Sequence, residues 1–254
     1  MDKEKEALRI DPAVKTEELV LAIRKTFDEK GFNKAVVGLS GGLDSSVVAF
    51  LLTRALGKEN VFALIMPYGG QDTTDSEEIA GTLGIKSEKV DIAPMVDAYF
   101  SRFPDADNVR RGNKMARERM SILYDQSHKA GALVAGTGNR TEIRLGYFTL
   151  HGDGACAVAP LAFLYKTQVR QLAEYLGIPD RIIKKRPSAD LWEGQFDEDE
   201  IGASYIELDC VLCLLDKGLP KEEIIEMGHE RSVVELVVEK IKKNKFKLEG
   251  PSLL

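Results

Sequence analysis

Apolar runs alternate with amphipathic stretches along the first two thirds of the chain. Strands are predicted at 35–39, 61–66, 87–92, 133–137 and 157–161, and helices at 45–56, 74–83 and 113–130. Mostly apolar strands that are separated by helices indicate a parallel sheet covered by helices on both faces. We therefore expect an α/β fold with a parallel sheet of about five strands, and ligands that bind at the carboxyl ends of those strands.

The pattern changes after residue 167, where only helical periodicity remains. Helices are predicted at 167–176, 201–217, 221–227 and 232–243. A polar segment at 184–200 lies among them, and a loop of this length in a compact domain is usually a lid or a binding loop, or else disordered. With no internal repeat and no long linker, we expect residues 1–254 to form a single domain whose C-terminal helical part covers about 167–247.

Composition and charge narrow the classes of function. The net charge is −6, with 35 Lys and Arg against 41 Asp and Glu, which argues against a protein that coats nucleic acid. The longest apolar run, 47–52, is too short for a membrane span, and the charged start lacks the apolar core of a secretory signal. Because there are only three cysteines, Cys156, Cys210 and Cys213, we expect a reduced, cytoplasmic protein.

A glycine-rich loop follows the first predicted strand. Residues 40–46 read Ser-Gly-Gly-Leu-Asp-Ser-Ser and lead directly into a helix. Glycines let the backbone approach an anion closely, serines add hydroxyl donors, and the helix directs its free N–H groups and positive dipole end at the same point. The loop is therefore predicted to bind phosphate, although it lacks the Gly-Lys-Ser/Thr element of a Walker A loop.

Asp44 in this loop indicates a metal-bound nucleotide rather than a simple anion. A carboxylate repels a phosphate unless a cation lies between them, and Mg²⁺ commonly takes one or two carboxylates together with phosphate oxygens. The alternative is a glycine-rich turn in which Asp44 only caps the following helix.

The loop resembles the pyrophosphate loop of the ATP pyrophosphatases, enzymes that cleave ATP between its α and β phosphates. Within that group the chain is similar to NAD synthetase, through motifs at 113–124, 136–142, 146–149, 152–154, 164–167 and 187–195. The resemblance implies a Rossmann-like three-layer α/β/α fold, a homodimer, Mg²⁺ as cofactor, and ATP, deamido-NAD⁺ and ammonia as substrates. It also implies the ammonia-dependent form without a glutaminase domain, because 254 residues leave no room for one.

The resemblance assigns roles to individual residues. Asp44 and Glu142 would hold Mg²⁺, and Lys166 would supply a positive charge to the phosphates, although a solvated lysine at a helix start is the alternative. Family positions that contact ATP match Gly38, Leu39, Ser40, Gly41, Gly42, Leu43, Asp44, Ser45, Ser46, Met66, Thr137, Lys166 and Ser188. Core packing explains Met66 equally well.

The second substrate and ammonia involve further positions. Arg117 matches a family residue that contacts deamido-NAD⁺ across the dimer, although an ion pair on a helix face is the alternative. Leu150 and Ala157 stand where many members have Lys and Asp that contact the dinucleotide. Asp153, which we expect to be catalytic, resembles a family acid near the second metal or ammonia site, where a carboxylate could attract ammonium and help to remove its proton. A His-Lys pair common near the end of the family has no clear equivalent, and residues 243–245 are the nearest stretch.

Two other functions remain open on the sequence. Leu150 and Ala157 could fit another AMP-forming amide ligase of the same superfamily with a different carboxylate substrate. A module that senses ATP without catalysis is the second alternative, but the acids and the lysine argue against it because sensing requires no cleaved bond.

Overall fold

The computed structural model describes residues 6–192 and 194–250. Within these residues, four parallel strands form one sheet in the order β3-β2-β1-β4. The strands are β1 (Ala35–Gly38), β2 (Val61–Ile65), β3 (Lys86–Lys89) and β4 (Leu133–Ala135). β1 is central because it pairs with β2 on one side and with β4 on the other. The predicted parallel α/β sheet is confirmed.

The prediction of a fifth strand at 157–161 is wrong. This run makes one isolated parallel bridge, between Val158 and Ala135, and hydrogen bonds from Ala157 N and Val158 N to Val134 O. Pro160 has no N–H to continue a ladder, and the chain turns immediately afterwards, with Ala162 N donating to Ala159 O. The segment therefore runs beside β4 without extending the sheet by a full strand.

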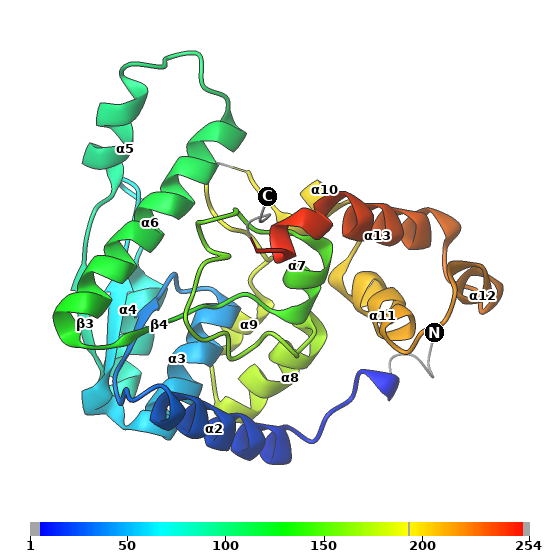
Figure 1. Ribbon diagram of the computed structural model, residues 1–254, viewed down its shortest axis with the longest axis horizontal. Helices are drawn as coiled ribbons and strands as arrows, with labels where there is room; N and C mark the ends of the chain where they lie inside the picture. Colours follow the sequence, from blue (N-terminus) through cyan, green and yellow to red (C-terminus); the bar gives the residue numbers. More distant parts are fainter. Residues whose placement is uncertain (1–5, 193, 251–254) are drawn as a thin grey trace.

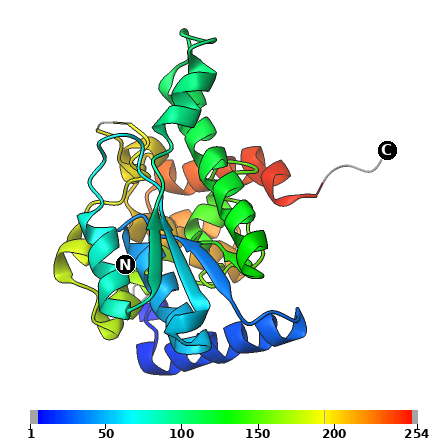
Figure 2. The ribbon, with the colours of Figure 1, turned by 90° about the vertical axis from the view of Figure 1, so that its left-hand side faces the viewer.

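Alternate residues of the central strands face opposite layers of the core. Ala35 and Val37 pack with α2 (Pro12–Glu29), α3 (Leu43–Leu56) and α8 (Lys166–Leu176), whereas Val36 packs with α5 (Ala93–Phe100) and α6 (Asn108–Ala130). Both faces are thus buried, which explains the continuous apolar runs in the sequence. Figure 1 shows the resulting three layers, and Figure 2 shows α5 and the start of α6 rising above the rest.

The remaining helices complete the layers and form a second core. On the α3 side lie α4 (Thr74–Leu83) and α9 (Asp180–Lys184). The second core is formed by α7 (Arg140–Leu145), α10 (Asp197–Ile201), α11 (Tyr205–Asp216), α12 (Lys221–Glu226) and α13 (Arg231–Asn244), of which α11, α12 and α13 lie to the right in Figure 1. Short 3₁₀ helices are η1 (Lys58–Asn60) and η2 (Lys245–Leu248). None of the helices within the described residues is long and apolar enough to cross a membrane.

Several helix boundaries differ from the prediction. The helix expected at 201–217 begins only at Tyr205, because Gly202 takes a left-handed φ of 100° and ends α10 at Ile201, and Ser204 then caps α11. The predicted lid at 184–200 consists of an irregular stretch between α9 and α10 and of α10 itself; Glu193 lies outside the described residues. The amphipathic pattern did not predict α2, α5 or α7.

Candidate active site

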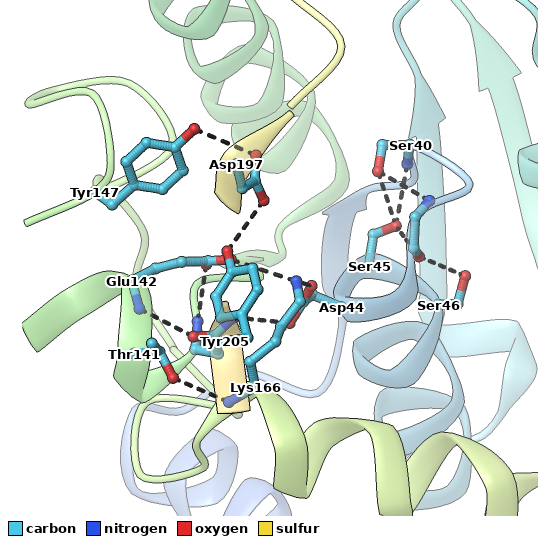
Figure 3. A network of polar contacts seen from close by, with 12 residues as sticks. Ser40, Asp44, Ser45, Ser46, Thr141, Glu142, Tyr147, Lys166, Asp197 and Tyr205 are labelled. Atoms are coloured by element: carbon cyan, nitrogen blue, oxygen red, sulfur yellow. Dashed lines mark hydrogen bonds and ion pairs between the residues drawn. The ribbon is translucent and has the colours of Figure 1, made fainter. Parts of the chain in front are cut away.

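The predicted phosphate loop connects β1 to α3 at the carboxyl edge of the sheet. Gly42 is the N-cap of α3, and no side chain caps this helix start. The serine hydroxyls bond within the loop: Ser45 Oγ lies 3.1 Å from Ser40 Oγ, and Ser46 Oγ donates to Gly42 O at 2.8 Å (Figure 3). The loop thus presents free helix N–H groups together with hydroxyls that can exchange an internal partner for a ligand.

Three charged side chains converge beside this loop from three helices. Asp44 lies in the first turn of α3, Glu142 in α7, and Lys166 is the first residue of α8. The Lys166 ammonium contacts the Asp44 carboxylate directly and lies 3.5 Å from Glu142 Oε1 (Figure 3). The Lys166 side chain is only 6% exposed, so these residues form a buried ionic cluster and not a solvated surface group.

Asn139 fixes both acids of this cluster. Its Oδ1 accepts the N–H of Glu142 at 3.0 Å, and Glu142 Oε2 in turn accepts the N–H of Asn139, which is a capping box. Its Nδ2 donates to Asp44 Oδ1 at 3.0 Å. The role of Asn139 was missed from the sequence, although the spacing Asn-x-x-Glu at 139–142 is a signal that predicts such a cap.

The pKa values of Glu142 and Lys166 are both raised, but for different reasons. Burial, followed by the negative charge of Asp44, raises the pKa of Glu142 and outweighs the opposing charge of Lys166. Burial disfavours the charged form of Lys166, but the carboxylates of Asp44 and Glu142 outweigh this effect and raise its pKa. Lys166 therefore remains a cation that neutralises the acids around it.

The donor set fits Mg²⁺ bound together with phosphate. The side chains of Asp44 and Glu142 both contact the Lys166 ammonium. A metal cation in the place of this ammonium would have two carboxylate ligands. No group of three or more His, Cys, Asp or Glu side chains among residues 6–192 and 194–250 could hold a metal by itself. Two protein oxygens completed by phosphate oxygens and water are the usual environment of Mg²⁺ at a nucleotide.

A buried acid from α10 adjoins the cluster and was not predicted as a site residue. Asp197 is 5% exposed and accepts hydrogen bonds from the hydroxyls of Tyr205 at 3.0 Å and Tyr147 at 3.3 Å (Figure 3). The ring of Tyr205 lies 5.1 Å from the Lys166 ammonium. Burial raises the pKa of the Asp197 carboxyl, and the charge of Lys166 opposes the shift.

A cavity of about 720 Å³ opens from this cluster along the carboxyl edge of the sheet. Most predicted ATP residues line it, among them Gly38, Ser40, Met66, Thr137, Lys166 and Ser188. Gly41 and Ser46 lie behind this lining. Met66 is buried, and its carbonyl accepts the guanidinium of Arg119 at 3.0 Å.

The cavity lining also contains Asp153 and a lysine from the C-terminal segment. Asp153 Oδ1 accepts the N–H of Thr149 at 2.9 Å. Lys247 donates to the carbonyls of Gly146 at 2.7 Å and Phe148 at 2.9 Å, and it lines the same cavity. No residue of the predicted stretch 243–245 lines the cavity; Lys247 does. The sequence is rich in lysine here and gives no signal of which lysine points inward.

Three residues that were predicted to adjoin deamido-NAD⁺ do not line the cavity: Arg117, Leu150 and Ala157. Arg117 is exposed on α6, and its Nε donates to Leu150 O at 3.1 Å. Ala157 lies beside β4 in the segment that forms the isolated bridge. None of the three lines the cavity of its own chain within the described residues.

The fold and the site define an α/β protein of the nucleotide-binding class, with a phosphate loop and a charged cluster at the carboxyl edge of a parallel sheet. The NAD synthase family model matches residues 15–251. The chain belongs to the NAD synthase family.

Individual relatives cover nearly the whole chain. The chain is 48% identical to the NH(3)-dependent NAD(+) synthetase of Fusobacterium nucleatum over 238 residues, which is 92% of each protein. Among solved structures, it is similar to NMN synthetase from Francisella tularensis (31% identity, TM-score 0.86, 97% of this chain and 99% of that chain). It is also similar to NH3-dependent NAD synthetase from Campylobacter jejuni in complex with the nitrate ion (32% identity, TM-score 0.83, 97% and 100%).

Proposed function

We propose that this chain is an ammonia-dependent NAD synthetase, a ligase that converts ATP, deamido-NAD⁺ and ammonia into AMP, diphosphate and NAD⁺. The observation that carries the proposal is the convergence of Asp44, Glu142 and Lys166 beside the phosphate loop. Membership of the NAD synthase family supports it, as does a curated ammonia-dependent relative of which the chain covers 92%.

The reaction has two steps, and each step requires a good leaving group. A carboxylate oxygen of the nicotinate attacks the α-phosphorus of ATP, the bond from that phosphorus to the bridging oxygen breaks, and diphosphate departs with the electron pair. Ammonia then attacks the carbonyl carbon of the acyl adenylate, AMP leaves, and a proton is lost from nitrogen. Adenylylation is needed because oxide is a poor leaving group, whereas AMP is a good one.

The residues of this chain stabilise the charge that develops in the first step. The N–H groups at the start of α3 and the serine hydroxyls of residues 40–46 bind the departing diphosphate. Lys166 offers its ammonium to the phosphates, and Asp44 and Glu142 are the residues that would hold Mg²⁺. When bound there, Mg²⁺ would neutralise the phosphates of ATP.

The residues that line the cavity support the remaining proposed contacts with ATP and ammonia. Met66, Thr137 and Ser188 line the cavity, and this supports their assignment to ATP. Asp153 lies in the same cavity, where its carboxylate attracts ammonium and accepts a proton as ammonia forms.

We further propose that the chain acts as a homodimer in the cytoplasm. Arg117 is exposed and does not line the cavity of its own chain, which supports a contact with the substrate held by a partner copy. Leu150, whose carbonyl holds Arg117, and Ala157 would adjoin that substrate. Three free cysteines agree with a reducing compartment.

One assay tests the proposal and separates it from its rival. The protein is incubated with ATP, Mg²⁺, ammonium and either deamido-NAD⁺ or nicotinate mononucleotide, and the products are separated by chromatography. We expect NAD⁺, AMP and diphosphate from the dinucleotide. The likeness to an NMN synthetase and the loss of a lysine at Leu150 favour the mononucleotide as the second candidate, and faster turnover of it would overturn the dinucleotide assignment.

A further inference from the structure

The first turn of α4 packs directly against the phosphate loop. Gly41 has a φ of +75°, and a Cβ at this position would lie 2.8 Å from the Cβ of Asp75 and 3.0 Å from Ser76 N. Any side chain at Gly41 would therefore push α4 away from the loop. The start of α4, a helix of ten residues, thus reaches the same loop as the start of α3.

Ser76 carries an unused hydroxyl at this contact. The residue is 2% exposed, lines the cavity, and its Oγ would lie 3.1 Å from a Cβ at Gly41. Whereas Ser40, Ser45 and Ser46 bond within the loop, the Ser76 hydroxyl makes no hydrogen bond to any of the described residues. The Ser76 hydroxyl is therefore accessible from the cavity, where a ligand can form a hydrogen bond with it.

Backbone donors of α4 point in the same direction. The N-cap Thr73 supplies no side-chain hydrogen bond to the helix start, because its hydroxyl donates to Glu77. Asp72 accepts only the N–H and hydroxyl of Thr74. The N–H groups of the next two residues, 75 and 76, therefore have no acceptor among the described residues, which is the donor set that an anion requires.

The two acids within this first turn, Asp75 and Glu77, are paired with cations, whereas Asp72, two residues before the helix, lines the cavity without an ion pair to any of the described residues. Asp75 pairs with Arg181 at 2.9 Å and with Lys185 at 3.5 Å, and Lys185 also lines the cavity. Glu77 pairs with Lys89 at 2.5 Å. The carboxylates of Asp75 and Glu77 consequently do not oppose a phosphate group at the helix start.

We propose that Ser76 and the N-terminus of α4 form a second wall of the pyrophosphate site, opposite the loop, and bind the β and γ phosphates of ATP and the released diphosphate. The inference rests on the proposed function and adds a binding residue to it. Phosphate oxygens that contact the N-termini of both α3 and α4 would be bound from two sides. Binding from two sides would keep the departing diphosphate directed away from the α-phosphorus.

The test compares binding of inorganic pyrophosphate and of AMP by calorimetry. Ser76→Ala is expected to weaken pyrophosphate binding about 10-fold, the usual effect of losing a hydrogen bond to a charged group, and to leave AMP binding within about twofold. Ser76→Thr keeps the hydroxyl and is expected to restore most of the affinity. Ser127→Ala, which removes another buried serine hydroxyl on α6, is the matched control and should change neither affinity.

Unchanged pyrophosphate binding in Ser76→Ala overturns the proposal, and so does an equal loss of pyrophosphate and AMP binding. If Ser76→Ala does not fold, hydrogen exchange on the wild-type protein decides: pyrophosphate, but not AMP, should protect the amides of residues 75 and 76. Because these measurements need no turnover, they remain distinct from the proposed function, whose own failure would appear as an absence of NAD⁺ from a protein that binds pyrophosphate normally.

Discussion

Asn139 and Asp44, separated by 95 positions, are joined by a hydrogen bond of 3.0 Å from the amide of Asn139 to the carboxylate of Asp44. The same amide side chain caps α7 and so determines where Glu142 lies. One fully buried asparagine therefore sets the spacing of the two acids proposed to hold Mg²⁺.

Replacing Asn139 by alanine should affect stability and catalysis together. Loss of the cap is expected to lower the free energy of unfolding by about 1–2 kcal/mol, measured by urea denaturation. Because Asp44 also loses its partner, the Mg²⁺ concentration that gives half-maximal activity should rise several-fold. Asp11→Ala removes the cap of α2, none of whose residues lines the cavity, and should lower stability alone. An Asn139→Ala variant with normal Mg²⁺ dependence would contradict the proposed link.

Replacing Lys166 by methionine should leave two buried carboxylates without their cation. We expect a loss of about 3 kcal/mol of stability near pH 7, since removing one partner of a buried pair leaves an uncompensated charge. The loss should shrink in thermal unfolding when Mg²⁺ is added or when the pH is lowered, because both remove the repulsion. Lys15→Met breaks an exposed pair and should have little effect. Equal stability of the two variants would show that Lys166 does not balance these acids.

Asp209 should make the protein less stable as the pH rises through weakly acidic values. Burial raises the pKa of Asp209 to about 6 from 3.8, and hydrogen bonds from Thr141 and Thr167 oppose the shift. The folded state therefore binds the proton more tightly than the unfolded state does. The stabilisation is complete below pH 4 and is lost as the pH rises to about 6, by about 2–3 kcal/mol in the free energy of unfolding. Asp209→Asn cannot titrate and should remove this slope; an unchanged slope would contradict the assignment.

Gln71 should control how firmly the segment between α9 and α10 closes over the cavity. Its amide nitrogen donates to Asp190 O at 2.5 Å and its amide oxygen accepts from Arg119 at 3.3 Å, so it links this segment to α6. We expect protection of 185–196 from proteases to increase when ATP and deamido-NAD⁺ are bound. Gln71→Ala should reduce this protection and raise KM for ATP several-fold, whereas Gln126→Ala, at a half-buried position of α6 that does not line the cavity, should do neither. Equal cleavage with and without both substrates would exclude a lid.

The local sequence pattern predicted the two inner strands and the phosphate loop because each of them depends on residues that are neighbours in the sequence. The buried runs of β1 and β2, and the turn Ser-Gly-Gly-Leu-Asp before α3, depend on neighbouring residues and were found. The split between α10 and α11 could also have been read, from Gly202 and the cap at Ser204. The fifth strand failed because an apolar run carries no information on whether a ladder can continue beside it.

Contacts between distant segments could not be predicted. Asp197 reaches the cluster through tyrosines from two other segments, and Lys247 enters the cavity from the end of the chain. The helix of Arg117 was predicted, but not which of its residues line the cavity: Asn113, Arg119 and Met120 do, and Arg117 does not. Such placements depend on how helices pack and not on their periodicity.

The most direct test counts the products of a single reaction with the wild-type protein and with the double variant Asp44→Asn/Glu142→Gln. Chromatography with ³¹P detection measures NAD⁺, AMP, ADP, phosphate and diphosphate after deamido-NAD⁺, ATP, Mg²⁺ and ammonium are mixed. We expect the wild-type protein to form AMP, diphosphate and NAD⁺ in equal amounts and the double variant to form none. Release of ADP by the wild-type protein, or full product formation by the variant, would contradict adenylylation assisted by these two acids.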